Sequence, residues 1–375
     1  MTDSRVWRHF DWILLLVVVL LVGYGATMIY SATHNIEDTR VGEAFTRQLL
    51  YAVIGLAVLI GMAAIDYRIW GGLHRIVYIV ALVLLVIALV LGRSQVGEVR
   101  RWITFGVFDV QPSEIAKYLI VLALAQYLAS HEEQMDRLRV VLGAIGLVVV
   151  PTVLVLVQPN LSTAVLLLMV GLTMIFIAGI RWRYLGVLSV AGVVVLPVLW
   201  IIFRSYIEAQ FAHVLPRLLV FFGLSDDPGV RFNLDQALIA TGSGGFWGKG
   251  FLNPSSLSQL HFLRVRHTDF IFSVIAEELG MLGVLVLFAL LIVLLSRLLR
   301  VAAISCDAFG RYAVIGFTMM VFFQAAVNIA MNLNLGPVAG LPLPFISYGG
   351  SALVTLMVAI GIVESVAMRH KKLEF

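Results

Sequence analysis

The chain has 375 residues, of which 61% are hydrophobic and only 13% charged, and its mean hydropathy is +1.00. A soluble domain of this length needs far more polar side chains to cover its surface, so the composition excludes an ordinary globular protein. The formal net charge of +4 is small for this length and does not indicate a nucleic-acid partner. Because Cys306 is the only cysteine, no disulfide can form within the chain.

Apolar residues come in long blocks, and a block of about 18 or more residues predicts a transmembrane helix. We predict an all-α polytopic membrane protein with ten spans, at residues 11–30, 46–64, 75–91, 112–130, 138–157, 161–180, 184–203, 268–296, 310–333 and 347–368. The first span follows two arginines, as a signal sequence would, but it lacks a convincing cleavage site and is interpreted as a retained anchor. An even number of spans places both termini on the same side of the membrane.

The distribution of Lys and Arg predicts the orientation. The termini and short loops of one side carry fourteen of these residues, against five in the short loops of the other side, so both termini are predicted to be cytoplasmic. The long segment 204–267, between the seventh and eighth spans, is then an extracytoplasmic loop within a single domain of residues 1–375. Its six basic residues indicate lipid headgroups or a phosphorylated substrate as a partner, and an ordinary solvated loop is an equal alternative.

Segment 97–117 contains the motif QPSEIAK at a predicted helix start, where Pro112 and Ser113 suit the first turn. Glu114 and Lys117 then lie on one face of the helix, one turn into the membrane, where charges are costly. They either form a satisfied ion pair that braces the helix or belong to a functional site. The second interpretation is favoured, because ionisable groups inside a membrane tend to be functional.

Segment 264–280 begins with RVRHTDF. Thr268 is predicted to cap the following span, which places Asp269 in the first helical turn, where the helix dipole stabilises a carboxylate. An ordinary capping acid is the alternative. Glu277 and Glu278 lie two turns deeper, where capping does not explain them, and we interpret them as hydrogen-bonding groups between neighbouring helices.

Segment 336–352 contains three prolines, which forbid a regular helix. Irregular backbone at membrane depth persists only when it is buried in protein or lines a wet cavity, so we expect a re-entrant or mouth-lining loop. The glycine-rich segment 241–250 looks like a phosphate-binding loop, but Ser243 and Gly250 stand where a Walker motif needs glycine and serine or threonine.

Taken together, the motifs RRWITFG, QPSEIAK, QPNLSTA, HTDFIFSVIAEELG and GLPLPFISYGGS resemble those of the SEDS family (shape, elongation, division and sporulation), which includes RodA, FtsW and SpoVE. They occur in the family's order over nearly the whole chain. Pro342 stands where FtsW proteins more often have threonine, so the chain looks more like RodA, the elongation member. Asn160 and Ser162 depart from the usual QPD and LGT residues, and no acidic role is assigned there.

The resemblance implies a peptidoglycan glycosyltransferase, which polymerises lipid II into glycan strands during cell-wall elongation and the maintenance of cell shape. The family's essential carboxylate falls on Asp269, and the acid and lysine proposed to line the same cavity fall on Glu114 and Lys117. The residues expected to bind substrate are Arg101, Trp102, Lys249, Arg264, Arg266, His267 and Ser347.

Sugar transfer from a lipid diphosphate needs a base near the acceptor hydroxyl and positive charge near the departing pyrophosphate. Asp269 is the expected base of an inverting transfer that forms a β-1,4 link, and Lys117 is expected to face the pyrophosphate. Lys117 and a helix N-terminus would both lower the pKa of Asp269, which leaves open that Asp269 positions substrate or metal instead. A divalent cation, Mg²⁺ or Mn²⁺, is left open, with Asp269 and Glu114 as the acids that would hold it, and no organic cofactor is expected.

The resemblance also implies a multi-pass protein of the bacterial cytoplasmic membrane, with its active site on the extracytoplasmic side. The implied partners are lipid II, membrane lipids and a class B penicillin-binding protein that supplies transpeptidation. Two other functions stay open. Intramembrane charges and broken helices are also features of a flippase or transporter of lipid-linked precursors, and a non-catalytic scaffold would only recruit the penicillin-binding protein.

Overall fold

The computed structural model describes residues 6–34, 42–91, 103–105, 108–181, 183–184, 186, 215–225, 227–258, 263 and 265–370. Within these residues the fold is helical, apart from one short antiparallel hairpin that pairs β1 (Ile103–Phe105) with β2 (Phe108–Val110). The predicted site residues Arg101, Trp102 and Arg264 lie outside the described residues. Most of the predicted span 184–203 also lies outside them.

Every other predicted span coincides with a helix. These helices are α1 (Trp12–Thr33), α3 (Ala44–Ala64), α5 (His74–Leu91), α6 (Pro112–Ser130), α7 (Leu138–Val157), α8 (Leu161–Ile177), α12 (Ile271–Ile304), α13 (Ala308–Asn332) and α14 (Gly350–Met368). The shorter helices are η1 (Val6–His9), α4 (Arg68–Gly72), η2 (Glu132–Gln134), α10 (Leu215–Phe221) and α11 (Pro228–Ser243). Helix α6 begins at Pro112, as predicted.

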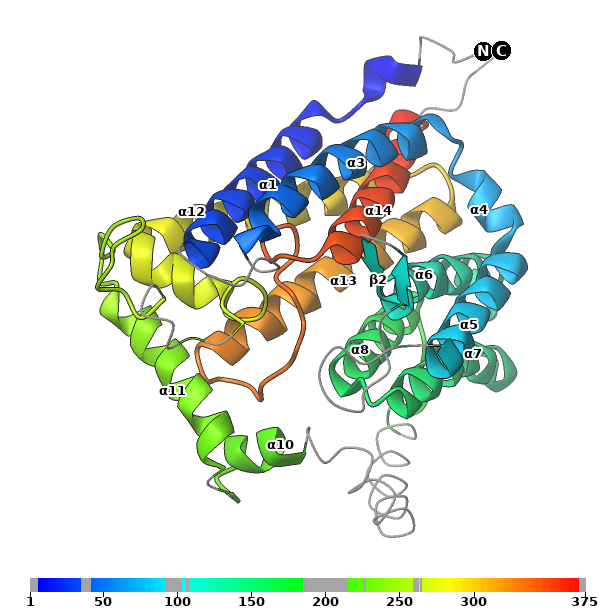
Figure 1. Cartoon of the computed structure of the whole chain (residues 1–375). Helices are drawn as coiled ribbons and strands as arrows, with labels where there is room; N and C mark the ends of the chain where they lie inside the picture. The colour runs from blue at the N-terminus through cyan, green and yellow to red at the C-terminus, as the bar shows by residue number, and fades with distance from the viewer. Residues whose placement is uncertain are drawn as a thin grey trace.

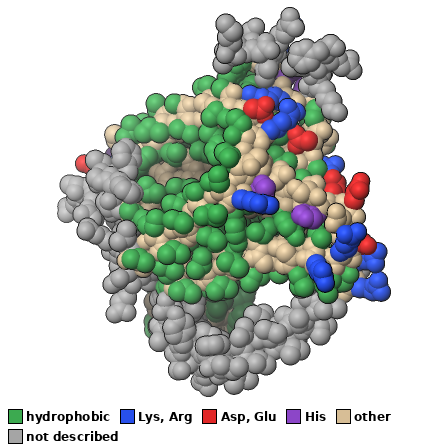
Figure 2. All heavy atoms as spheres, turned by 90° about the vertical axis from the view of Figure 1, so that its right-hand side faces the viewer, with side chains coloured by type: hydrophobic (Ala, Val, Ile, Leu, Met, Phe, Trp, Pro, Cys, Tyr) green, Lys and Arg blue, Asp and Glu red, His purple; other side chains and the backbone are tan. Residues whose placement is uncertain are grey.

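Six of the helices are long and apolar enough to cross a membrane, and α5 and α8 contain shorter apolar stretches, His74–Val90 and Leu161–Ile177. Large apolar side chains face outward along them, with Val53 66%, Val90 65% and Ile292 66% exposed. Figure 2 shows one face that is largely hydrophobic, with most of its charged side chains in the upper and right-hand parts of the view. Such a surface needs lipid around it, so the chain is a multi-pass membrane protein.

The helices form two groups that meet at α6 and α13 (Figure 1). One group contains α1, α3, α12, α13 and α14, and the other contains α5, α6, α7 and α8. Helix α6 contacts helices of both groups, and most of its side chains are buried, including Glu114 and Lys117. The two charges of the QPSEIAK motif therefore lie in the protein interior and not against lipid.

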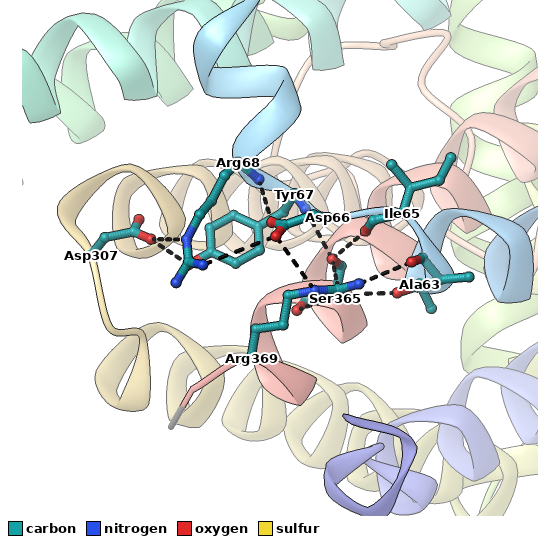
Figure 3. Close-up of polar contacts among 9 residues, drawn as sticks. Ala63, Ile65, Asp66, Tyr67, Arg68, Asp307, Ser365 and Arg369 are labelled. Carbon is teal, nitrogen blue, oxygen red and sulfur yellow. Dashed lines mark hydrogen bonds and ion pairs between the residues drawn. The ribbon is translucent and has the colours of Figure 1, made fainter. Parts of the chain in front are cut away.

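One end of the bundle is closed by a polar cluster between α3, the α12–α13 turn and α14 (Figure 3). The Arg369 guanidinium donates to the carbonyls of Ala63 at 3.2 Å and Ala64 at 2.9 Å, which satisfies the last carbonyls of α3. The rings of His9 and His370 lie 4.9 Å apart, so both described ends of the chain lie on this side.

Helix α12 is longer than predicted and contains a kink. It ends at Ile304 and not near residue 296, and Gly280 within it has a non-helical backbone (φ 64°, ψ −160°). The kink frees the carbonyl of Glu278, which accepts from the amide of Gly250 at 3.0 Å. The amide of Met281 donates in turn to the carbonyl of Gly245 at 2.9 Å. The glycines of segment 241–250 therefore allow backbone to pack against the kink, which explains them without a phosphate ligand.

Replacement of Gly248 by alanine should destabilise the protein by about 2 kcal/mol or more. Gly248 has φ +80°, and an added Cβ would lie 2.2 Å from the carbonyl oxygen of Glu278. Thermal unfolding of the purified variant in detergent measures the loss. The control is Gly242→Ala on α11, where nothing lies within 4 Å of an added Cβ, and which should leave stability unchanged or slightly higher. Equal unfolding temperatures for the two variants would contradict the packing role.

Candidate active site

Asp269 lies in a turn that precedes α12. The helix begins at Ile271 with Phe270 as its N-cap, and no side chain caps it. The prediction that Thr268 is the N-cap is wrong, because its hydroxyl donates to the carbonyl of Val265 at 3.2 Å in the preceding turn. Asp269 is therefore outside the first helical turn, at the mouth of the span.

Two side chains of α13 hold the backbone of this turn. The backbone carbonyl oxygen of Asp269 accepts from the side-chain amide nitrogen, Nδ2, of Asn328 at 3.0 Å and from that of Asn332 at 3.1 Å. Both asparagines are fully buried. Because the anchors are on the main chain, the carboxylate of Asp269 is left free of them.

The proline-rich segment after α13 holds the same turn from another side. Residues 336–349 are non-helical, with Leu343 and Phe345 buried, as predicted, whereas the last three residues of the predicted segment 336–352 already belong to α14. The Ser347 hydroxyl donates to the carbonyl of Thr268 at 2.6 Å and accepts from the amide of Leu343 at 2.8 Å. The amide of Tyr348 donates to the carbonyl of His267 at 2.9 Å. Ser347 thus joins loop and turn, and its contact with substrate stays a prediction.

The surroundings of the turn favour Asp269 as a proton acceptor. Burial raises the pKa of Asp269 to about 6, and the positive charge of Arg217 on α10 opposes that rise. The expectation of a lowered pKa is wrong, because Asp269 lies before the helix and desolvation outweighs the charge beside it. Burial and the neighbouring Arg266 lower the pKa of His267 to about 4, so its imidazole is neutral at neutral pH.

An apolar cavity of about 250 Å³ lies between α8, α10, α13 and the proline-rich segment. Arg217 lines it, and so does Ser162, one of the two positions where the chain departs from the SEDS pattern. An added Cβ at Gly340 would lie 3.8 Å from Oδ2 of Asp269, so the carboxylate is beside the same proline-rich segment. Asp269 does not line the cavity itself, but the proline-rich segment borders both its carboxylate and the cavity that Arg217 lines.

Glu114 and Lys117 form a buried ion pair. The Lys117 ammonium donates to the two carboxylate oxygens at 2.9 and 2.8 Å and to Oε1 of Gln324 on α13 at 3.3 Å. The two side chains are 5% and 1% exposed. Among the described residues, no hydrogen bond or ion pair joins this pair to Asp269. Direct contact of either side chain with substrate stays a prediction.

Lys249 forms an ion pair with a buried carboxylate. Its ammonium lies 2.7 Å from Oε1 of Glu277, a fully buried carboxylate that also accepts from the amides of Leu257 and Ser258. Glu277 thereby holds the segment before α12 against this helix.

Arg266 is also held by neighbouring groups of the protein. It is 3% exposed, and its guanidinium donates to the carbonyls of Ala32 and Ser258. Glu278 accepts from the Ser31 hydroxyl of α1 at 2.6 Å. The prediction of hydrogen bonds between neighbouring helices is confirmed for Glu278, which joins α12 to α1, whereas Glu277 bonds the non-helical segment that precedes α12. The substrate contacts expected of Lys249, Arg266 and His267 stay predictions.

The expected metal ligands do not form a site together. In the part of the chain that the structure describes, no group of three or more His, Cys, Asp or Glu side chains is arranged to hold a metal ion. Both carboxylate oxygens of Glu114 already accept from Lys117. A divalent cation at Asp269 stays a prediction, since Mg²⁺ can be held by one carboxylate together with waters and substrate phosphates.

Known proteins match almost the full length of the chain. The family model described as cell cycle protein, which covers FtsW, RodA and SpoVE, matches residues 11–372. The chain belongs to the SEDS family. The peptidoglycan glycosyltransferase MrdB of Escherichia coli K12 is 38% identical over 366 residues, which cover 97% of this chain and 95% of MrdB. Stage V sporulation protein E of Bacillus subtilis is 32% identical over 366 residues, which cover 95% and 96%.

Solved structures of SEDS proteins share the fold. A chain of a peptidoglycan synthase complex that coordinates polymerisation and crosslinking matches with a TM-score of 0.80 and 29% identity, covering 96% of this chain and 98% of that chain. The rod shape determining protein RodA of Thermus thermophilus matches with a TM-score of 0.68 and 29% identity, covering 98% and 99%. The family and the likeness to RodA expected from the motifs are confirmed.

Proposed function

We infer that this chain polymerises lipid II into glycan strands, as a peptidoglycan glycosyltransferase of the SEDS family. Its 38% identity to MrdB over 97% of the chain supports the activity. The observation that carries the chemistry is the turn before α12, where burial raises the pKa of Asp269 to about 6, beside Arg217 and an apolar groove. A base for proton transfer near neutral pH needs such a pKa.

In the proposed reaction, the carboxylate of Asp269 removes the proton of the GlcNAc 4-hydroxyl of one lipid II molecule. That oxygen attacks the anomeric carbon of the MurNAc at the end of the growing chain. A C–O bond forms with inversion, and the bond from this carbon to the phosphate oxygen breaks with its electron pair. Arg217 stabilises the charge of the departing lipid pyrophosphate. Arg101, Trp102 and Arg264 are proposed to bind substrate.

The proposed setting is the bacterial cytoplasmic membrane, with ten spans, both termini cytoplasmic, and the segment 204–267 and the active site outside. The Arg- and Lys-rich loops of the sequence support this orientation. The likeness to RodA supports a role in cell-wall elongation and cell shape. A class B penicillin-binding protein is the proposed partner, because a matching chain belongs to a complex that couples polymerisation to crosslinking.

The test is polymerisation of lipid II by the purified chain in detergent, with and without a class B penicillin-binding protein. We expect glycan strands whose amount grows with time, since no membrane has to be crossed in this assay. Binding of lipid II without strand formation in both conditions would instead favour a flippase. Strand formation by the complex that is unchanged when Asp269 is replaced by asparagine would favour a scaffold.

A further inference from the structure

We propose that Asn328 of α13 is a positioning residue of the active site, which fixes the Asp269 turn against the proline-rich segment. This inference rests on the proposed function. The side-chain amide nitrogen, Nδ2, of Asn328 donates to the backbone carbonyl of Asp269 at 3.0 Å and to that of Leu341 at 2.8 Å. A carboxamide nitrogen has two hydrogens, so one side chain joins the two segments with its full donor capacity.

Asn328 is the middle member of a stripe on α13. Gln324, Asn328 and Asn332 stand four residues apart, so they share one face of the helix and lie about 6 Å apart along its axis. All three are fully buried. Gln324 donates to the carbonyl of Pro342 at 2.9 Å, which directly follows Leu341, whose carbonyl accepts from Asn328. The rigid helix thus sets the spacing of the contacts.

The proline-rich segment needs donors from elsewhere. Its prolines have no amide hydrogen, so it cannot pair its backbone in a regular element. Carbonyl groups buried at membrane depth are costly unless a donor reaches them. Gln324 and Asn328 supply donors to consecutive carbonyls, those of Pro342 and Leu341. The stripe therefore decides where this segment lies.

The same contacts place the carboxylate. Asp269 receives two amide donors on its carbonyl oxygen, from Asn328 and Asn332, while its Oδ2 lies beside Gly340. Asn328 therefore connects the residue that carries the carboxylate to Leu341, which follows Gly340 in the chain. A displacement of about 1 Å in such a site costs on the order of 100-fold in rate. Loss of the Asn328 contacts should therefore lower the turnover rate more than it weakens substrate binding.

The stripe also connects the two parts of the site. Oε1 of Gln324 accepts from the Lys117 ammonium at 3.3 Å, and its amide nitrogen holds Pro342. A chain of contacts thus runs from the buried Glu114–Lys117 pair through α13 to the Asp269 turn.

The test is the Asn328→Leu variant, which keeps the side-chain volume and removes both donors. We expect kcat for lipid II polymerisation to fall about 10- to 100-fold, with KM within about threefold of the unchanged protein. The matched control is Thr318→Val on the same helix, whose buried hydroxyl donates only to its own helix, to Val314 at 2.7 Å. This control should keep kcat within about twofold.

Three results would overturn the proposal. One is an Asn328→Leu variant with unchanged kcat, another is a Thr318→Val variant that loses as much, and the third is a loss that appears only in KM. If the leucine variant fails to fold, Asn328→Ser has the same expected effect on kcat, because a hydroxyl has one hydrogen in place of two. Unchanged protein that makes no strands would refute the proposed function itself, and the two failures are thereby distinguished.

Discussion

Replacement of Asp269 by asparagine should lower the rate of glycan polymerisation by about 10²- to 10⁴-fold, the contribution of a general base. Asparagine has the same shape but cannot take the proton of the acceptor hydroxyl. The turn should keep its place, because α13 holds it through the carbonyl of Asp269 and not through the carboxylate. The rate is measured with purified protein and lipid II. Asp235→Asn, an exposed acid on α11, serves as the control and should stay fully active.

The pH dependence gives a second measurement on the same variant. With the pKa of Asp269 raised to about 6, kcat/KM should fall as the pH drops through about 6, because the base becomes protonated. The folded pKa is above the usual value of about 3.9, so the contribution of Asp269 to stability is most favourable below about pH 4 and is lost as the pH rises through 6. Asp269→Asn should therefore unfold at a higher temperature than the unchanged protein at pH 8 and at the same temperature near pH 4. An acid limb near pH 4, or an asparagine variant with normal activity, would contradict the base role.

The sequence predicts the membrane helices well, because the bilayer requires long apolar blocks and the blocks are visible. The clearest difference is that α12 extends beyond the predicted span. The predicted span stops near residue 296, before Arg297 and Arg300, but the helix continues to Ile304. Charges end the part of a helix that lies in lipid, and they do not end the helix itself, since arginine favours helical backbone.

The site could be predicted only in part. The HTDF motif identifies Asp269, but the direction of its pKa depends on burial, which the sequence does not show. Arg217 stands 52 residues before Asp269 in the numbering, and no local pattern connects the two. The spacing of Asn328 and Asn332 is visible in the sequence, but the carbonyls that they hold belong to segments on either side of α13.

Replacement of Lys117 by methionine should destabilise the protein by about 3–5 kcal/mol, because it leaves the buried carboxylate of Glu114 without its cation. Both side chains are at most 5% exposed, and their nearest N–O distance is 2.8 Å. The control is Arg47→Met, which breaks an Arg47–Glu43 pair with the same 2.8 Å distance but with side chains 29% and 59% exposed. That change should cost about 0.5 kcal/mol or less. Thermal unfolding in detergent compares the two variants.

The double variant Glu114→Gln, Lys117→Met separates a structural role of the pair from a catalytic one. It removes both charges, so most of the lost stability should return. If the pair only braces α6 against α13, polymerisation should return with stability, and if either side chain contacts substrate, the double variant should be folded but inactive. We expect the first result, because the Lys117 ammonium already has acceptors on Glu114 and Gln324 and its side chain is 1% exposed. A stable, inactive double variant would instead place the pair among the groups that bind lipid II.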